Sequence, residues 1–183
     1  MANMKREPTK KKRFLSPEVL EETLEALEVE GDQFVVVGGL AMQSYGSDRL
    51  TGDLDLLAET VPVMVHKFKA TYLSFGGVRF VMNGVPVDII VRNDDLRALY
   101  RDAYEKALDE TTTRVVSLEH LAVMKMAAGR SKDMLDLEFL LTHPRANYAS
   151  IKALAVRFLG WYAGKELDVL RSEAEWKKKS GLS

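Results

Sequence analysis

The chain of 183 residues contains no cysteine, so it can form neither a disulfide nor a thiolate metal site. It also lacks an apolar run long enough to span a membrane, and its basic N-terminus lacks the apolar segment of a secretory signal. No sign of charge dominates, because 26 basic residues nearly balance 27 acidic ones. This balance argues against a general polyanion-binding protein but allows a local basic groove. We therefore expect a soluble, cytoplasmic protein with no membrane partner.

Hydrophobic residues make up 46% of the chain, which is enough for a sizeable core at this length. The pattern changes from mixed strands and helices to helices alone in the second half. We expect a flexible basic tail at 1–15, an α/β core at 16–112 and a helical region at 113–183. The predicted fold class is α+β, with a small mixed or antiparallel β-sheet and its helices followed by a C-terminal helical bundle.

Local signals place the individual elements. Strands are predicted at 34–37 and 53–58, where β-branched and apolar residues gather, and Asn83-Gly84 predicts a hairpin between two further strands. Helices are predicted from Ser16-Pro17 to near Gly31, from Gly38, over 63–73, over 94–109, on both sides of Gly129, and once or twice more towards the C-terminus.

Two aspartates flank one leucine on the second predicted strand. Residues i and i+2 of a strand point to the same face, so Asp53 and Asp55 should project together while Leu54 and Leu56 face the core. Two carboxylates so close repel each other and call for a cation between them. Mg²⁺ commonly takes one or two carboxylates together with substrate phosphates. The alternative is an exposed strand edge with solvated charges.

A third acid, Asp88, lies among apolar residues in the second arm of the predicted hairpin, where aspartate is disfavoured. If this strand pairs beside the first, Asp88 can reach the same site. Three carboxylates could then hold two metal ions, the arrangement suited to in-line phosphoryl displacement. The alternative is a single acid near a strand end.

Glycines and basic residues near the acids suggest a phosphate site. Gly38 and Gly39 open a helix directly after a strand, where free N–H groups attract phosphate, although a plain tight turn would need the same residues. Ser47 and Arg49 occupy the loop before the aspartates, and arginine there could clamp phosphate oxygens. Basic residues of the helical half could point back at the cleft or lie on a solvated helix surface.

Together these motifs resemble the nucleotidyltransferase superfamily of the DNA polymerase β type. The strongest part is "FVVVGGLAMQSYGSDRLTGDLDLL" at 34–57; "VPVDII" supplies the third acid, and "SLEHLAVMKMAAGRSKDMLDLEFL" is similar to the helical segment that follows. The resemblance spans roughly 16–141 and is greatest to the bacterial AbiEii/AbiGii branch, which includes the MenT-like toxins.

The resemblance implies roles for particular residues. Gly38 and Gly39 would cradle a triphosphate, Asp53 and Asp55 would bind Mg²⁺, and Asp88 would bind the catalytic metal and help to deprotonate an acceptor hydroxyl. The implied phosphate contacts are Arg49 and Lys125, and the later Lys-Asp motif is matched by Lys132 and Asp133. Many members have serine where this chain has Gly39.

The predicted function is therefore transfer of an NMP from an NTP to an acceptor hydroxyl, with two Mg²⁺ ions as cofactor. The acceptor could be RNA, such as a tRNA 3′ end, as for a toxin with an antitoxin partner, and the basic segments 5–13 and 176–179 could touch its backbone. One alternative is an aminoglycoside-type enzyme, for which Asp133, Asp136 and Glu138 could supply an acidic acceptor pocket. The other is a catalytically silent binding or antitoxin-type module.

Overall fold

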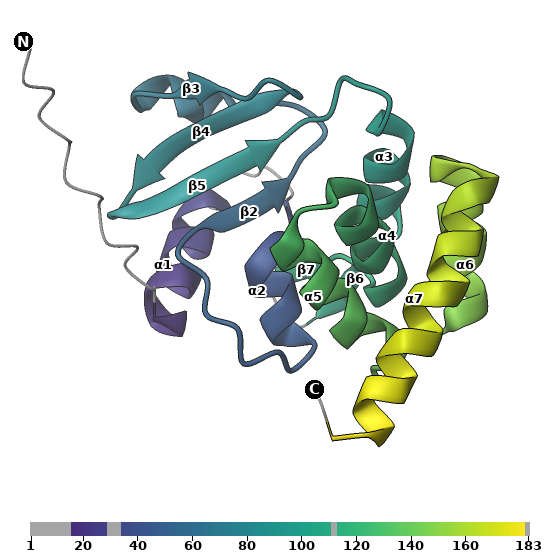
Figure 1. The fold of residues 1–183 in the computed structure, drawn as a ribbon. Coiled ribbons are helices and arrows are strands. Elements are labelled where there is room, and N and C mark those ends of the chain that lie inside the picture. Colours follow the sequence, from purple (N-terminus) through teal and green to yellow (C-terminus); the bar gives the residue numbers. More distant parts are fainter. Residues whose placement is uncertain (1–15, 29–33, 111–112, 182–183) are drawn as a thin grey trace, which may run out of the picture.

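A computed structural model describes residues 16–28, 34–110 and 113–181 of the chain. The expected basic tail lies outside the described residues. The described part forms a seven-stranded mixed sheet in the order β3-β4-β5-β2-β1-β7-β6, with helices around it (Figure 1). This architecture agrees with the predicted α+β class.

The first half of the chain supplies most of the sheet. After α1 (Pro17–Glu28), the strands and helices are β1 (Val35–Val36), α2 (Gly38–Ser44), β2 (Leu54–Leu57), a 3₁₀ helix η1 (Val63–Lys67), β3 (Thr71–Tyr72), β4 (Gly77–Met82), β5 (Val85–Ile90) and α3 (Arg97–Glu105). Strands β2 and β5 are parallel, whereas β4 and β5 form the antiparallel hairpin predicted at Asn83-Gly84. The turn is tight because both of its residues adopt positive φ.

The second half is mainly helical. It contains β6 (Leu108–Glu110), β7 (Thr113–Val115), α4 (Leu118–Ala128), α5 (Ser131–Leu141), α6 (Tyr148–Leu159) and α7 (Trp161–Lys179). Gly129 ends α4 in the left-handed conformation, which explains why the two predicted helices meet there. In Figure 1, α4 to α7 lie together on the right, beside the sheet. No helix of the described ranges is long and apolar enough to cross a membrane.

Two local predictions were wrong. The expected helix over 63–73 is only the short η1, after which Thr71 and Tyr72 pair with β4; sheet pairing of this β-branched and aromatic dipeptide overrides the helical pattern. The expected helix over 94–109 ends at Glu105, and the chain continues into β6. Because β7 pairs in parallel with β1, the sheet extends past the boundary expected at 112.

The core runs continuously from the sheet into the helices. It includes Leu54, Leu56 and Ile89 from the central strands, and Leu121 and Leu137 from α4 and α5, each at most 1% exposed. The expectation that Leu54 and Leu56 face the core is therefore confirmed. This shared core fixes α4 and α5 against the sheet that carries the acidic residues.

Candidate active site

The acidic residues come from two neighbouring parallel strands. Asp55 of β2 and Asp88 of β5 are partners in register, and Asp53 directly precedes β2. Strand alternation turns Leu54 and Leu56 into the core and leaves Asp55 on the opposite face. The sheet thus places two carboxylates side by side, with the third next to them along the chain.

The Asp55 carboxyl group lies in an unfavourable environment for a negative charge. Its pKa is raised from the ordinary value of 3.8 to about 6, first by burial and then by the neighbouring charges of Asp53 and Asp88. Lys125 and Lys132 oppose this shift. Carboxylates that disfavour each other's ionisation in this way attract a cation.

Asp88 is held by an arginine that sequence reasoning missed. Arg79 of β4 forms a bidentate pair with it, with Nε 2.6 Å from Oδ1 and Nη2 2.5 Å from Oδ2. Asp88 is 5% exposed, whereas the Arg79 side chain is 55% exposed. The hairpin could have revealed this pair, since the Asn83-Gly84 turn fixes the register that places Arg79 opposite Asp88.

The two glycines are required by the packing beside the acids. Gly38 has φ +62°, and a Cβ there would lie 1.9 Å from Oδ2 of Asp55. A Cβ on Gly39 would lie 2.6 Å from Oγ1 and 2.8 Å from Cβ of buried Thr51. The backbone at the start of α2 therefore touches the Asp55 carboxylate directly, and Thr51 explains why serine would not fit at Gly39.

The three acidic side chains, as they are arranged in the structure, are only partly suited to binding a metal ion. Asp53 and Asp55 offer hard oxygen ligands with excess negative charge, which suits Mg²⁺. Asp88 is engaged by Arg79, and among the described residues no group of three acidic or histidine side chains is arranged to hold an ion. Asp53 and Asp55 thus fit a magnesium ion chemically, while Asp88 could join them only by leaving the exposed Arg79 side chain.

Several predicted phosphate contacts lie in a buried ion network instead. Lys125 is 6% exposed; its Nζ lies 2.6 Å from Asp136 and 3.3 Å from Asp133 of α5. Arg49 also pairs with Asp136, and Arg130 pairs with Asp133. These pairs link the loop before β2 and helix α4 to α5, so their first role is to hold the helices against the sheet.

The other two predicted phosphate contacts differ in position. Lys132 is exposed on the first turn of α5 and acts electrostatically on both Asp53 and Asp55. Partial desolvation of its ammonium group, together with the charges of Arg130 and Arg49, lowers its pKa. Ser47 accepts a hydrogen bond from the backbone N–H of Arg49 at 3.3 Å, which shapes the loop. Lys132 is therefore better placed than Ser47 to meet an anionic ligand near the acids.

A cleft of about 490 Å³ opens over Asp55 and Asp88, between the sheet and helices α3, α4 and α5. Gly38, Asp55 and Asp88 line its floor. On its rim, the Arg92 guanidinium stacks on the rings of Phe75 and Tyr100, with centroids 4.6 and 4.8 Å away. The volume falls within the usual range for small-ligand sites. Tertiary packing alone unites these aromatic rings, so no local sequence signal predicts them.

Comparison with known proteins supports the fold assignment. No protein-family model and no curated protein matches the sequence. A candidate nucleotidyltransferase from H. pylori aligns over 91% of this chain and 98% of its own, with a TM-score of 0.50 and 17% identity. The antibiotic-resistance factor ANT(2'')-Ia aligns in its solution structure over 81% of this chain and 94% of its own, with a TM-score of 0.54 and 12% identity. The chain therefore has the fold of nucleotidyltransferases.

Proposed function

We propose that the protein is a magnesium-dependent nucleotidyltransferase that moves an NMP from an NTP to an acceptor hydroxyl. The observation that carries the proposal is the juxtaposition of Asp55 and Asp88, in register on parallel strands, with the Gly38 backbone at the floor of one cleft. Acidic oxygens and a side-chain-free backbone turn together suit a metal-bound triphosphate.

Each residue has a defined task in this proposal. Asp53 and Asp55 hold Mg²⁺, which neutralises charge on the phosphates when bound. Gly38 and Gly39 let the triphosphate approach the backbone, and Lys132 contacts its oxygens. Asp88, once released from Arg79, accepts the proton of the acceptor hydroxyl. The acceptor oxygen then bonds to the α-phosphorus as the bond to the β-phosphate oxygen breaks and pyrophosphate leaves.

The acids suggested for a cationic acceptor are already paired. Asp133 and Asp136 are buried in the ion network, and Glu138 lies 2.6 Å from Lys177 of α7. This pairing disfavours an aminoglycoside-type acceptor, although ANT(2'')-Ia has a related fold. We therefore favour RNA, for example a tRNA end, within a toxin–antitoxin pair, as the resemblance implies.

The basic segments give this choice of acceptor limited support. Segment 5–13 lies outside the described residues. In segment 176–179, Lys177 pairs with Glu138, and Lys178 donates a hydrogen bond to the Thr142 carbonyl at 3.1 Å. Two of these three lysines therefore help to hold α7 on α5, and the preference for RNA rests on the paired acids and on the resemblance rather than on these lysines.

Incubation of the protein with Mg²⁺, total cellular RNA and each NTP, labelled at either the α- or the γ-phosphate, tests the proposal. Transfer should label one RNA size class from the α-label only, and Asp55→Asn should abolish it. Label arriving from the γ-phosphate would indicate a kinase instead. No transfer to RNA or to small acceptors, together with no nucleotide binding, would favour the silent module.

A further inference from the structure

A second, smaller cavity adjoins the cleft. It measures about 260 Å³ and shares Arg92 and Tyr100 with the cleft. Its walls are the ends of β2 and β5 and one side of α3. Leu57 lies two residues beyond Asp55, and Arg92 lies four beyond Asp88. At about 3.3 Å per strand residue, the cavity therefore begins roughly 7–13 Å from the acids.

The charged side chains of this cavity are mostly arginines. Arg92, Arg97 and Arg101 line it together with a single acid, Glu59. Arg97 and Arg101 are four residues apart on α3, so they share one side of the helix. We call this cavity the arginine pocket.

One arginine of the pocket is held in place by its neighbours, and the other two are exposed and could bind a ligand. Arg92 is only 12% exposed; stacking on two rings and a bidentate pair with Asp94 fix its guanidinium. Arg101 makes an exposed pair with Glu105 at 2.8 Å, which contributes little and exchanges readily. Arg97 is exposed, and within the described ranges no ion pair involves it. The pocket therefore offers two guanidinium groups to a ligand: that of Arg97, and that of Arg101, whose exposed partner is easily displaced.

We propose that the arginine pocket binds a phosphate group of the acceptor, so that the second substrate is an oligonucleotide or a small phosphorylated molecule. Arginine forks match phosphate oxygens in geometry as well as in charge. The exposed charge of Arg97 would repel a polycationic acceptor. That the bound phosphate belongs to the acceptor rests on the proposed function, whereas phosphate binding by the pocket does not depend on it.

The position of the pocket separates it from the proposed triphosphate site. Gly38 follows β1, which lies on the side of β2 away from β5, whereas the pocket is built on the ends of β2 and β5 and on α3. The NTP phosphates are assigned to the glycine turn and Lys132. The arginine pocket is thereby left for the second substrate, on the side of Asp88.

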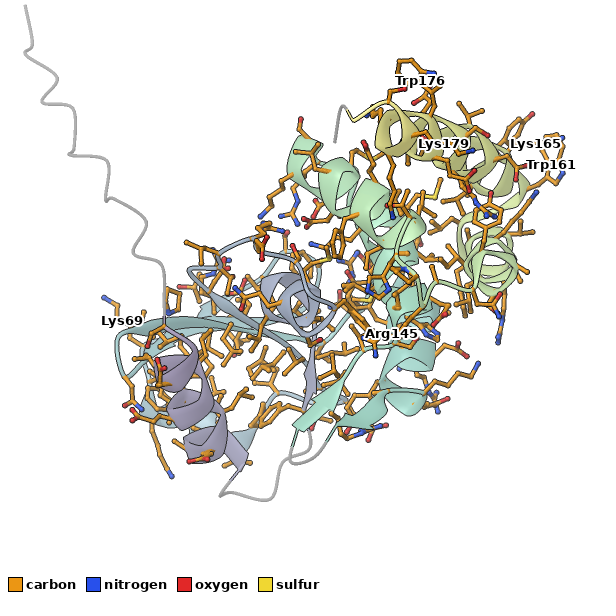
Figure 2. All side chains as sticks on the ribbon, turned by 90° about the horizontal axis from the view of Figure 1, so that it is seen from below. Lys69, Arg145, Trp161, Lys165, Trp176 and Lys179 are labelled. Atoms are coloured by element: carbon orange, nitrogen blue, oxygen red, sulfur yellow. The ribbon has the colours of Figure 1, made fainter. Side chains whose placement is uncertain are left out.

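Binding of a 5′-fluorescein single-stranded RNA oligonucleotide, measured by anisotropy in EDTA without NTP, tests the proposal independently of catalysis. The test variant is Arg97→Gln/Arg101→Gln, which removes two exposed charges. The matched control is Arg145→Gln/Lys165→Gln, which also removes two positive charges. Arg145 stacks over Tyr45 and Lys165 over Trp161. Figure 2 labels both control residues and shows Lys165 next to Trp161. Neither control residue lines the pocket.

The pocket variant should bind the oligonucleotide about ten- to a hundredfold more weakly, and the control within about twofold of wild type. The slope of log K against log salt should fall by about 0.7 in the pocket variant, for the one phosphate contact that is lost. If the oligonucleotide does not bind but inorganic phosphate does, with the same dependence on Arg97 and Arg101, the acceptor is a small phosphorylated molecule.

Three results would overturn the proposal. The first is equal weakening in the pocket and control variants. The second is loss of Mg²⁺-NTP affinity in the pocket variant with oligonucleotide and phosphate binding unchanged, which would make the cavity part of the NTP site. The third is binding of neither anion while an aminoglycoside binds. Absence of transfer activity alongside arginine-dependent phosphate binding would instead count against the proposed function alone.

Discussion

Replacing Asp55 by asparagine should remove activity and yet stabilise the metal-free protein. The substitution keeps the shape that Gly38 accommodates and removes a charge that the fold disfavours. The pKa of Asp55 rises from 3.8 to about 6 on folding, chiefly through burial. At about 1.4 kcal/mol per pKa unit, the charged form costs at most about 3 kcal/mol at neutral pH. For a chain of this size that corresponds to roughly 6–12 °C in Tm.

The pH dependence of this effect has a definite sign. Because the pKa of Asp55 is raised in the folded state, wild type and Asp55→Asn should be about equally stable below about pH 4, where Asp55 is protonated in both states. As the pH rises through about 6, wild type loses stability relative to the variant, because folding then has to bury the Asp55 charge. Urea denaturation in EDTA should therefore show a gain for the variant of about 3 kcal/mol at pH 7.5 and about half of that at pH 5. A variant that is no more stable than wild type at pH 7.5, or a gain that grows at pH 5, would show that the fold does not disfavour the Asp55 charge.

Three further substitutions test neighbouring contacts. Gly39→Ser should lower the free energy of unfolding by about 1–3 kcal/mol, because its Cβ would overlap Thr51; unchanged urea denaturation would contradict this. Arg79→Ala should increase Mg²⁺ affinity severalfold in calorimetry by releasing Asp88, and weaker binding would show that Arg79 positions the acid rather than blocks it. Lys125→Met should cost about 1.5–3 kcal/mol in urea denaturation, because two carboxylates of α5 lose a buried charged donor while Arg49 and Arg130 still pair with them. If the free energy of unfolding fell by less than 1 kcal/mol and NTP binding became weaker, Lys125 would be a ligand contact rather than a structural ion pair.

Signals within short segments predicted much of the fold. The Asn83-Gly84 hairpin, the glycine start of α2 and the glycine break between α4 and α5 depend on local backbone conformation, which the residue type controls directly. The edge strands were harder to predict. Thr71–Tyr72 and Leu108–Glu110 are too short for a periodic pattern, and their hydrogen bonds come from partners elsewhere in the chain.

The candidate site was predictable in its acids but not in its cations. Asp53, Asp55 and Asp88 stand out because aspartate is unusual beside buried strands. A basic residue in a helix has no such signature, since a solvated surface, a buried ion pair and a ligand contact look alike in sequence. Lys125 is in an ion pair, and Arg92 is fixed by aromatic rings that come together only in three dimensions. The pairing of Arg79 with Asp88 can be predicted only once the register of the hairpin is known.

The most direct test of the metal–nucleotide site is calorimetric titration of each NTP into the protein with Mg²⁺ and, separately, with EDTA. We expect at least one NTP to bind with Mg²⁺, and EDTA or Asp53→Asn/Asp55→Asn to abolish this binding while the double variant stays folded. Equal NTP affinity in EDTA, or undiminished binding by the folded double variant, would show that these acids do not form a metal–nucleotide site.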